Sequence, residues 1–386
     1  MSMLRRAAVL VAALGGSASG AAPITGSTPA DEDMVVALAH GSTLICSGAI
    51  IGPHAVLTAA HCLVDSSLPD VVEGAAVATG THHRVVAAFV HPDYDADTFD
   101  HDIAVVIVDS ELAGAPQPFA TTLPPGVVVG GTMRVLGYGW TVANDPLPAE
   151  RRGGTSRIDA VDSLRIRSSA APSQACEGDS GGPALVDGSV VGVASSGDVN
   201  CTQFARHTRV DAHAAFVADV LARTAAGGAK PGDRCWYDAN CETGSCVQAL
   251  DEPRWSFCSP PCDDGACPAG LACIVDGNQE ERCRHPWPSP GADRHACNSD
   301  EDCASDLCVA PAGESQAVCA TRCFSDLPGF DCPVNTVCRD AADGTEACFA
   351  IESDAGGCRV APGDDGALLA FGVIGLTALV VRRRAA

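Results

Sequence analysis

The cysteines divide this chain into parts that must fold by different rules. Of the 21 cysteines among 386 residues, four precede residue 202, sixteen lie between residues 235 and 348, and one is at position 358. A chain of this length is too long for one compact domain of ordinary size. The cysteine-rich part has too few apolar residues for cores of its own, so it has to be held together by cross-links.

The first 22 residues have the three parts of a secretory signal: two arginines, an apolar run and a stretch of small residues. We assign residues 1–22 to the signal-peptide segment and expect cleavage after Gly20 or Ala21 on export, because Pro23 disfavours a cut after Ala22. Export leads to an oxidising compartment, in which paired thiols persist as disulfides. Zinc sites built from these cysteines are the less favoured interpretation.

The charge of the chain argues against nucleic acid as a partner. Asp and Glu number 48 against 24 Lys and Arg, a net charge of −24 at pH 7, and an acidic protein repels a phosphate backbone. We expect no metal ion and no cofactor, because the histidines outside the motifs described below show no ligand spacing. These histidines are His40, His54, His82, His83, His91, His207 and His213.

Residues 24–225 have the pattern of an all-β domain. Short apolar or alternating runs, such as Ile103–Val108, recur with Gly, Pro and Asp between them, and this spacing is typical of a sandwich or barrel. The run Ala184–Val193 predicts a hairpin with a primed turn at Asp187-Gly188. Ala212–Arg223, with Asp211 as its N-cap, is the one good amphipathic helix, and it closes the domain.

Three short motifs contain the residue types of nucleophilic catalysis. Ser180 lies in CEGDSGGP, residues 176–183, where glycines leave backbone N–H groups bare. Such a turn can both attack a carbonyl group and hold the resulting oxyanion. His61 lies in TAAHC, residues 58–62, and Asp102 lies in HDIA, residues 101–104. Each motif alone has a structural explanation, but their combination favours an enzyme.

These motifs resemble those of the chymotrypsin-like, or trypsin-fold, serine proteases and follow that family's order. The resemblance implies two six-stranded β-barrels followed by a helix. It implies that Ser180 is the nucleophile, that His61 is the base and then the acid, and that Asp102 orients the histidine. It also implies an oxyanion hole formed by the N–H groups of Gly178 and Ser180, and a protein or peptide substrate.

The same resemblance implies two disulfides and an activation step. The disulfides are Cys46–Cys62 and Cys176–Cys201. In the family, the carboxylate beside the nucleophile, here Asp179, pairs with the α-amino group of a freed isoleucine, for which Ile24 is the candidate. No Arg or Lys precedes Ile24, so we expect its terminus to be exposed by removal of the dipeptide Ala22-Pro23 after signal cleavage.

The resemblance also places a specificity pocket. Gln174 stands at the pocket base where trypsins carry an aspartate, Ser195 and Gly197 belong to the strand that pairs with the substrate backbone, and Ala205 stands at a pocket wall. Without a carboxylate at the base, nothing offsets the desolvation of a Lys or Arg side chain. We therefore expect cleavage after small or medium uncharged residues.

Residues 235–283 and 297–348 contain eight cysteines each, and five of their seven intervals are identical, which indicates an internal duplication. We expect four disulfides in each block, with a connectivity that spacing does not reveal, and linkers at 226–234 and 284–296. The blocks resemble cysteine-rich repeats that secreted myxobacterial proteins append to enzymes. Two interpretations stay open: a surface that binds a protein or matrix ligand, and a protease-resistant stalk.

The last segment, residues 349–386, combines Gly357-Cys358, an apolar run at Ala367–Val381 and three arginines. It resembles myxobacterial C-terminal sorting signals, in which a protein is processed near that cysteine and held at the surface. Cys358 is the odd cysteine, as this interpretation requires; a plain transmembrane anchor is the alternative.

The sequence thus predicts an exported serine endopeptidase anchored at the cell surface or outer membrane. The alternative is a surface binding or adhesion protein, in which the cysteine-rich repeats bind a ligand and the protease fold is vestigial.

Overall fold

The computed structural model describes residue 24 and residues 27–63, 68–140, 149–250, 255–275, 280–286, 289–292, 294–305, 307–322 and 336–350. The expected signal peptide and the sorting or anchor segment from residue 351 on, with Cys358, lie outside these residues. Within the described ranges, no helix is long and apolar enough to cross a bilayer.

The first half of the protease region forms a curled antiparallel sheet in the order β6-β5-β2-β3-β4-β8-β7. Its strands are β2 (Val35–His40), β3 (Thr43–Gly52), β4 (Ala55–Thr58), β5 (Asp70–Glu73), β6 (Thr81–His83), β7 (Val85–Val90) and β8 (Ala104–Val108). Only Arg84 separates β6 from β7, so one run of chain pairs with β5 at its start and with β8 at its end. This run joins the two edges of the sheet. We call this curled sheet the first barrel.

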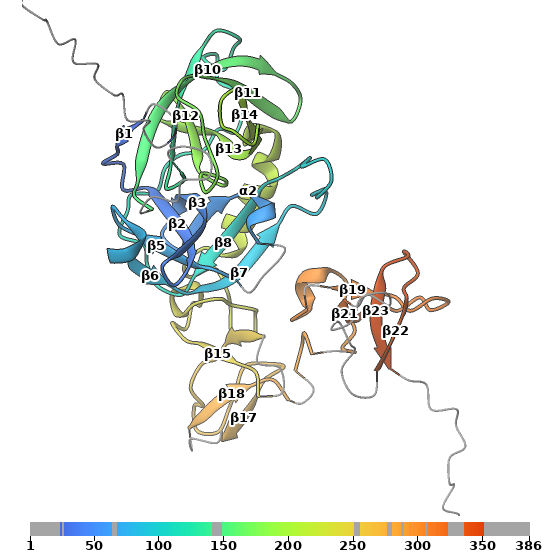
Figure 1. Ribbon diagram of the computed structural model, residues 1–386. Coiled ribbons are helices and arrows are strands. Elements are labelled where there is room, and N and C mark those ends of the chain that lie inside the picture. The colour runs from blue at the N-terminus through green and yellow to red at the C-terminus, as the bar shows by residue number, and fades with distance from the viewer. Residues whose placement is uncertain are drawn as a thin grey trace, which may run out of the picture.

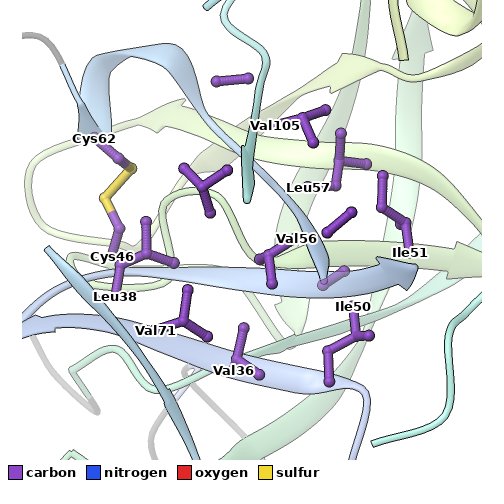
Figure 2. Packing of buried hydrophobic residues seen from close by; sticks show 14 of the residues in the cluster. Val36, Leu38, Cys46, Ile50, Ile51, Val56, Leu57, Cys62, Val71 and Val105 are labelled. Atoms are coloured by element: carbon purple, nitrogen blue, oxygen red, sulfur yellow. A yellow bond between two sulfur atoms is a disulfide. The ribbon is translucent and has the colours of Figure 1, made fainter. Parts of the chain in front are cut away.

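The interior of the first barrel is filled by aliphatic side chains. All five residues of β8 are buried, as are the first five of β2, because side chains on one face fill the barrel while the other face is covered by neighbouring elements. Figure 2 shows Leu38, Ile50, Leu57 and Val105 converging in this core, next to the disulfide between Cys46 and Cys62. That disulfide ties β3 to the short 3₁₀ helix η1 (Ala60–Cys62).

The second half forms a closed barrel of six strands in the order β10-β11-β14-β13-β12-β9, in which β9 pairs again with β10. We call it the second barrel. Its strands are β9 (Thr132–Gly137), β10 (Arg152–Val161), β11 (Arg165–Pro172), β12 (Pro183–Val186), β13 (Ser189–Gly197) and β14 (Phe204–Arg209), and β1 (Thr28–Pro29) extends it beside β10. In Figure 1 the second barrel, in green, lies above the first, in blue. The predicted all-β fold of two barrels is confirmed.

The predicted hairpin is confirmed, and the predicted helix starts later than expected. Asp187 and Gly188 both have positive φ, 49° and 76°, as a primed turn requires. A 3₁₀ turn, η3 (Asp211–His213), precedes helix α2 (Ala214–Arg223). Asp211 is not the N-cap of α2, because it is the first residue of η3 and His213 occupies the N-cap position; the Asp211 carboxylate accepts a hydrogen bond from Arg209 Nη2 at 2.7 Å.

The cysteine-rich part is built from short hairpins clamped by disulfides. The first four cysteines of each block are joined first to third and second to fourth, and the last four of the first block follow the same rule. The bonds are Cys235–Cys246, Cys241–Cys258, Cys262–Cys273, Cys267–Cys283, Cys297–Cys308 and Cys303–Cys319. The hairpins are β15 (Cys246–Gln248) with β16 (Ser256–Cys258), β17 (Ala272–Val275) with β18 (Glu281–Arg284), and β19 (Cys308–Val309) with β20 (Val318–Cys319). A sheet of β21 (Thr321–Arg322), β23 (Glu346–Ala350) and β22 (Thr336–Asp340) ends the described chain.

The first cysteine-rich block packs against the first barrel. Tyr237 stacks on His54 with ring centroids 3.8 Å apart, and its hydroxyl donates a hydrogen bond to the carbonyl of Thr224, just after α2. Trp236 meets Phe89 of β7 edge to face at 5.6 Å. Figure 1 shows β15 to β18 below the first barrel. The block is therefore joined to the protease region by side-chain contacts as well as by the chain.

Candidate active site

His61 is held in one orientation by two hydrogen bonds to the same carboxylate. It lies in η1, directly after β4, and the neighbouring Cys62 is tied to β3 by its disulfide. His61 Nδ1 lies 2.8 Å from Asp102 Oδ2, and the backbone N–H of His61 donates to Asp102 Oδ1 at 3.0 Å. With its Nδ1 occupied in this way, the ring keeps Nε2 for chemistry in the adjacent cavity.

Asp102 is completely buried and precedes the first residue of β8 by two positions. Ser195 Oγ of β13 donates a hydrogen bond of 2.6 Å to its Oδ2, the same atom that faces His61 Nδ1. Burial alone would raise the pKa of Asp102, but the hydrogen bonds from His61 and Ser195 and the attraction of the imidazole together lower it. The carboxylate is therefore ionised at neutral pH. The sequence analysis missed this contact of Ser195, which has no local signature.

Ser180 lies at the tip of a tight turn whose glycines are required sterically. Gly178 and Gly181 have φ of 87° and 80°, and a Cβ at Gly181 would lie 2.2 Å from the carbonyl oxygen of Ser47 and from Thr58 Oγ1. The N–H of Ser47 in β3 donates to the Ser180 carbonyl at 2.7 Å. The turn is thus pressed against the first barrel, next to η1.

The peptide group between Glu177 and Gly178 is fixed in its orientation. The N–H of Trp140 donates to the Glu177 carbonyl at 2.7 Å, and in a trans peptide the N–H points opposite to the C=O. The N–H of Gly178 therefore points away from Trp140. Among the described residues, neither this N–H nor that of Ser180 has a hydrogen-bond acceptor, so both donors are free for a ligand.

One cavity of about 290 Å³ brings these groups together. His61 and Ser180 both line it, with Ser195, Gly197 and Ala205 from the expected specificity pocket. Phe99 lies at its rim and meets the His61 ring edge to face at 5.6 Å. The wall facing these residues is crossed by the disulfide between Cys176 and Cys201.

The structure places Gln174 differently from the sequence expectation. Its side chain is fully buried and lies outside the cavity lining. Its Nε2 donates to Asp198 Oδ1 at 3.0 Å and to the carbonyl of Phe204 at 2.8 Å. The Nε2 of the amide therefore supports the pocket wall through Asp198, while its Oε1 is buried without a hydrogen-bond partner among the described residues.

Three further charged residues line the cavity: Glu177 from the CEGDSGGP motif, and Asp198 and Arg206, which the sequence analysis did not name. Slight burial would raise the pKa of Asp198, but hydrogen bonds from Gln174 and from backbone N–H groups hold it well below its ordinary value. Those donors occupy both carboxylate oxygens. The Arg206 guanidinium lies 4.5 Å from the ring centre of Phe204. The one indication in the sequence that Asp198 could line the cavity is that it directly follows Gly197, a residue of the expected specificity pocket.

Asp179 is the most unusual carboxyl group near the site. It is 1% exposed, and its oxygens accept hydrogen bonds from the N–H groups of Gly139 at 2.8 Å and Cys176 at 2.9 Å. Burial raises the pKa of Asp179 to about 7, although these two bonds act to lower it. No cationic side chain within the described ranges forms an ion pair with it. Ile24 is buried in the second barrel with φ of 37°, and its nitrogen is an amide while residue 23 is attached.

Comparison with known proteins gives consistent results for the protease region. The sequence profile of a family described as Trypsin matches residues 24–217, which is half of the chain. A trypsin of Saccharopolyspora erythraea is 28% identical over 171 residues, 40% of this chain and 75% of that protein. Hypodermin-B of Hypoderma lineatum is 31% identical over 186 residues, 42% of this chain and 72% of that protein. Among solved structures, neuropsin, a serine protease expressed in the limbic system of mouse brain, is 22% identical with a TM-score of 0.46, covering 51% of this chain and 97% of its own.

Proposed function

Since this chain belongs to the trypsin family of serine proteases, we propose that it is an exported endopeptidase that cleaves protein substrates through an acyl-enzyme on Ser180. The observation that carries the proposal is the shared cavity: Ser180 and His61 both line it, and His61 is bonded through Nδ1 to the buried Asp102. A nucleophile beside a base that is itself oriented by a third group is the arrangement that covalent catalysis requires.

In the first half of the reaction, Ser180 Oγ attacks the scissile carbonyl carbon while its proton moves to His61 Nε2. The charge that develops on the carbonyl oxygen is stabilised by the N–H groups of Gly178 and Ser180. Asp102 stabilises the imidazolium without taking up the proton. When the C–N bond breaks, His61 returns the proton to the leaving amine, and the acyl group remains on Ser180.

In the second half, water replaces the amine. His61 Nε2 takes a proton from the water as its oxygen attacks the ester carbon, and the same N–H groups hold the second oxyanion. The C–O bond to Ser180 then breaks, and His61 gives the proton to Ser180 Oγ. The enzyme returns to its starting state, and the product is a free carboxylate.

Ser195 is the other serine near Asp102, but its position does not suit a nucleophile. Its hydroxyl proton is committed to Asp102 Oδ2 at 2.6 Å, and the residue is only 9% exposed. A hydroxyl bonded to the orienting carboxylate has only that carboxylate as a base, and the lowered pKa of Asp102 makes it too weak to take the proton of a serine. Ser195 is therefore assigned to positioning Asp102, and Ser180 to covalent chemistry.

For the substrate, we propose cleavage after small or medium uncharged residues. The cavity lining includes small side chains at Ala175, Ser195 and Ala205. Two carboxylates line the cavity. Asp198 is already bonded to several donors, with the positive charge of Arg206 also in the lining, and Glu177 is exposed to solvent. A Lys or Arg side chain that is desolvated in the pocket would thus find no free counter-charge except at the solvent-exposed Glu177.

Activation is proposed to depend on Asp179 and a freed Ile24 terminus. An α-ammonium group at Ile24 would offer the cation that a buried carboxylate needs. Export is supported by the many disulfides, which are typical of oxidising compartments. Anchoring at the surface through residues 349–386, and ligand binding by the cysteine-rich blocks, remain proposals from the sequence.

The function is tested by incubating the purified chain, starting at Ile24, with an unfolded protein substrate and identifying the products by mass spectrometry. We expect new internal peptide ends that appear with the native chain and are absent with Ser180→Ala. Ser169→Ala is the matched control, because that hydroxyl bonds to the carbonyl groups of Arg157 and Ala171, away from the cavity. Equal cleavage by the Ser180→Ala protein would disprove the assignment.

A further inference from the structure

Three histidines lie close together next to the catalytic Asp102, and His213 is more than a hundred positions away from the other two in the sequence. His91 follows β7, His101 directly precedes Asp102, and His213 ends η3 in front of α2. One ring nitrogen from each of them lies within 4.8 Å of the others. We propose that His91, His101 and His213 bind a divalent transition-metal ion such as Zn²⁺.

The facing nitrogens of His101 and His213 are within about 0.4 Å of the spacing of two zinc ligands. His101 Nδ1 and His213 Nε2 are 3.0 Å apart, and two nitrogens each about 2.1 Å from a tetrahedral zinc ion lie roughly 3.4 Å apart. His213 Nδ1 donates to the carbonyl of Arg209 at 2.7 Å. This bond leaves Nε2 with a lone pair facing His101, and a metal-bound histidine is commonly fixed by such a bond. A bound ion would replace the proton that now joins the two rings, and His101 would carry its proton on Nε2.

His91 completes the group from the opposite side. Its ring stacks on that of His101, with centroids 5.0 Å apart at 15°, and meets His213 edge to face at 4.9 Å. The N–H of Asp93 donates to His91 Nδ1 in an exposed bond of 3.2 Å. Coordination through Nε2 moves the ring proton to Nδ1, and water then accepts the Asp93 N–H instead.

The surroundings of the three histidines favour a metal-binding site over side chains that are merely packed together. His213 is buried, whereas His91 and His101 are half exposed, so an ion can enter and a water can fill a fourth position. The intervening loop contributes carboxylates at Asp93, Asp95, Asp97 and Asp100. Among the described residues, the other close groups of potential ligands all include cysteines that are bound in disulfides. The histidine cluster is therefore the one whose ligand atoms are all available.

Metal binding would act on the base of a loop that reaches the active site. His91 and His101 bracket residues 92–100, and Phe99 in this loop lines the catalytic cavity. His213 belongs to the segment that leads into α2, which packs on β8. A bound ion would link the loop to that segment. It would also restrain Asp102, because one of the ligands, His101, is the residue that directly precedes it.

The test is a zinc titration of the full, metal-stripped chain in competition with a chromogenic chelator. We expect one zinc ion per chain, and an affinity at least about tenfold lower in His91→Gln and in His213→Gln, since even changes behind a ligand cost that much. His82→Gln is the control, because His82 is an exposed histidine paired with Asp70. His61→Gln is measured as well and should keep the ion, which separates the proposed site from the catalytic histidine.

Thermal unfolding without metal shows whether each variant is folded. If His213→Gln unfolds because His213 is buried, the half-exposed His91→Gln still decides the question. Absence of zinc binding, or binding that is unchanged in His91→Gln but lost in His61→Gln, would overturn the proposal.

Discussion

Ser195 Oγ lies 2.6 Å from Asp102 Oδ2, the atom that also lies 2.8 Å from His61 Nδ1. One carboxylate oxygen thus joins a side chain from each barrel, because His61 comes from η1 of the first and Ser195 from β13 of the second. The orientation of His61 therefore depends on how the two barrels are packed against each other.

Ser195→Ala tests this dependence. Loss of one hydrogen bond to a charged group costs about 1.5 kcal/mol or more, which corresponds to a roughly tenfold lower kcat/KM. The native protein, Ser195→Ala and the Ser169→Ala control are compared in steady-state peptide hydrolysis. Because Ser180 remains, the activity should fall without disappearing. Complete loss of turnover in a folded Ser195→Ala protein would mean that Ser195 takes part in the chemistry itself.

The raised pKa of Asp179 predicts how stability depends on pH. In a chain that extends upstream of Ile24, the folded state keeps this group protonated up to about pH 7, whereas the unfolded state ionises near pH 3.8. The folded state binds the extra proton, so the free energy of unfolding falls as the pH rises from about 4 to 7. A shift of about three pKa units corresponds to roughly 4 kcal/mol.

Urea unfolding across this range measures the loss, with two comparisons. Asp179→Asn should remove most of the slope. A chain that begins at Ile24 should remove it too, because an ammonium partner would lower the pKa of Asp179, and this chain should be far more active than one beginning at Ala22. Equal slopes and equal activities for the two N-termini would show that some other group satisfies Asp179.

Tyr237→Ala should loosen the first cysteine-rich block from the first barrel. The substitution removes the stack on His54 and the hydrogen bond to Thr224, and truncation of a buried aromatic side chain costs about 3 kcal/mol or more. Hydrogen exchange of the amides at residues 225–240 should become much faster. Leu250→Ala is the control, since Leu250 is 62% exposed. Unchanged exchange in Tyr237→Ala would mean that the chain connection alone holds the block.

A digest of a peptide library should show cleavage after uncharged side chains. Gln174 is buried outside the cavity lining, and the Asp198 oxygens are occupied by Gln174 and by backbone N–H groups. Matched peptides that differ only in Ala, Leu, Lys or Asp before the cut provide the comparison. A strong preference for Lys or Arg would show that Asp198 is free to pair with the substrate after all.

The sequence predicted what depends on local chemistry. The turn around Ser180 requires glycines at 178 and 181 because of positive φ and close contacts, and these constraints are visible as a motif. The hairpin at Asp187-Gly188 was predictable for the same reason. Alternating apolar residues predicted strands, but only the resemblance to a family predicted that they close into two barrels.

The contacts that the sequence did not predict join residues remote from each other. Ser195 and Asp102 are 93 positions apart, and His101 and His213 are 112 apart. Neither pair has a spacing that could be recognised, because the fold alone brings the partners together. The sequence predicted Gln174 at the pocket base, but it could not predict the hydrogen bonds of its amide to Asp198 and to a carbonyl of β14.

The central claim is that Ser180 is the activated nucleophile, and covalent labelling tests it most directly. The chain beginning at Ile24 is treated with a fluorophosphonate probe, and the modified residue is located by mass spectrometry. We predict a single adduct on Ser180 Oγ, its absence in Ser180→Ala, and its persistence in Ser195→Ala. Absence of labelling in the folded native chain, or an adduct that persists in Ser180→Ala, would contradict the account and favour a binding protein with a vestigial protease fold.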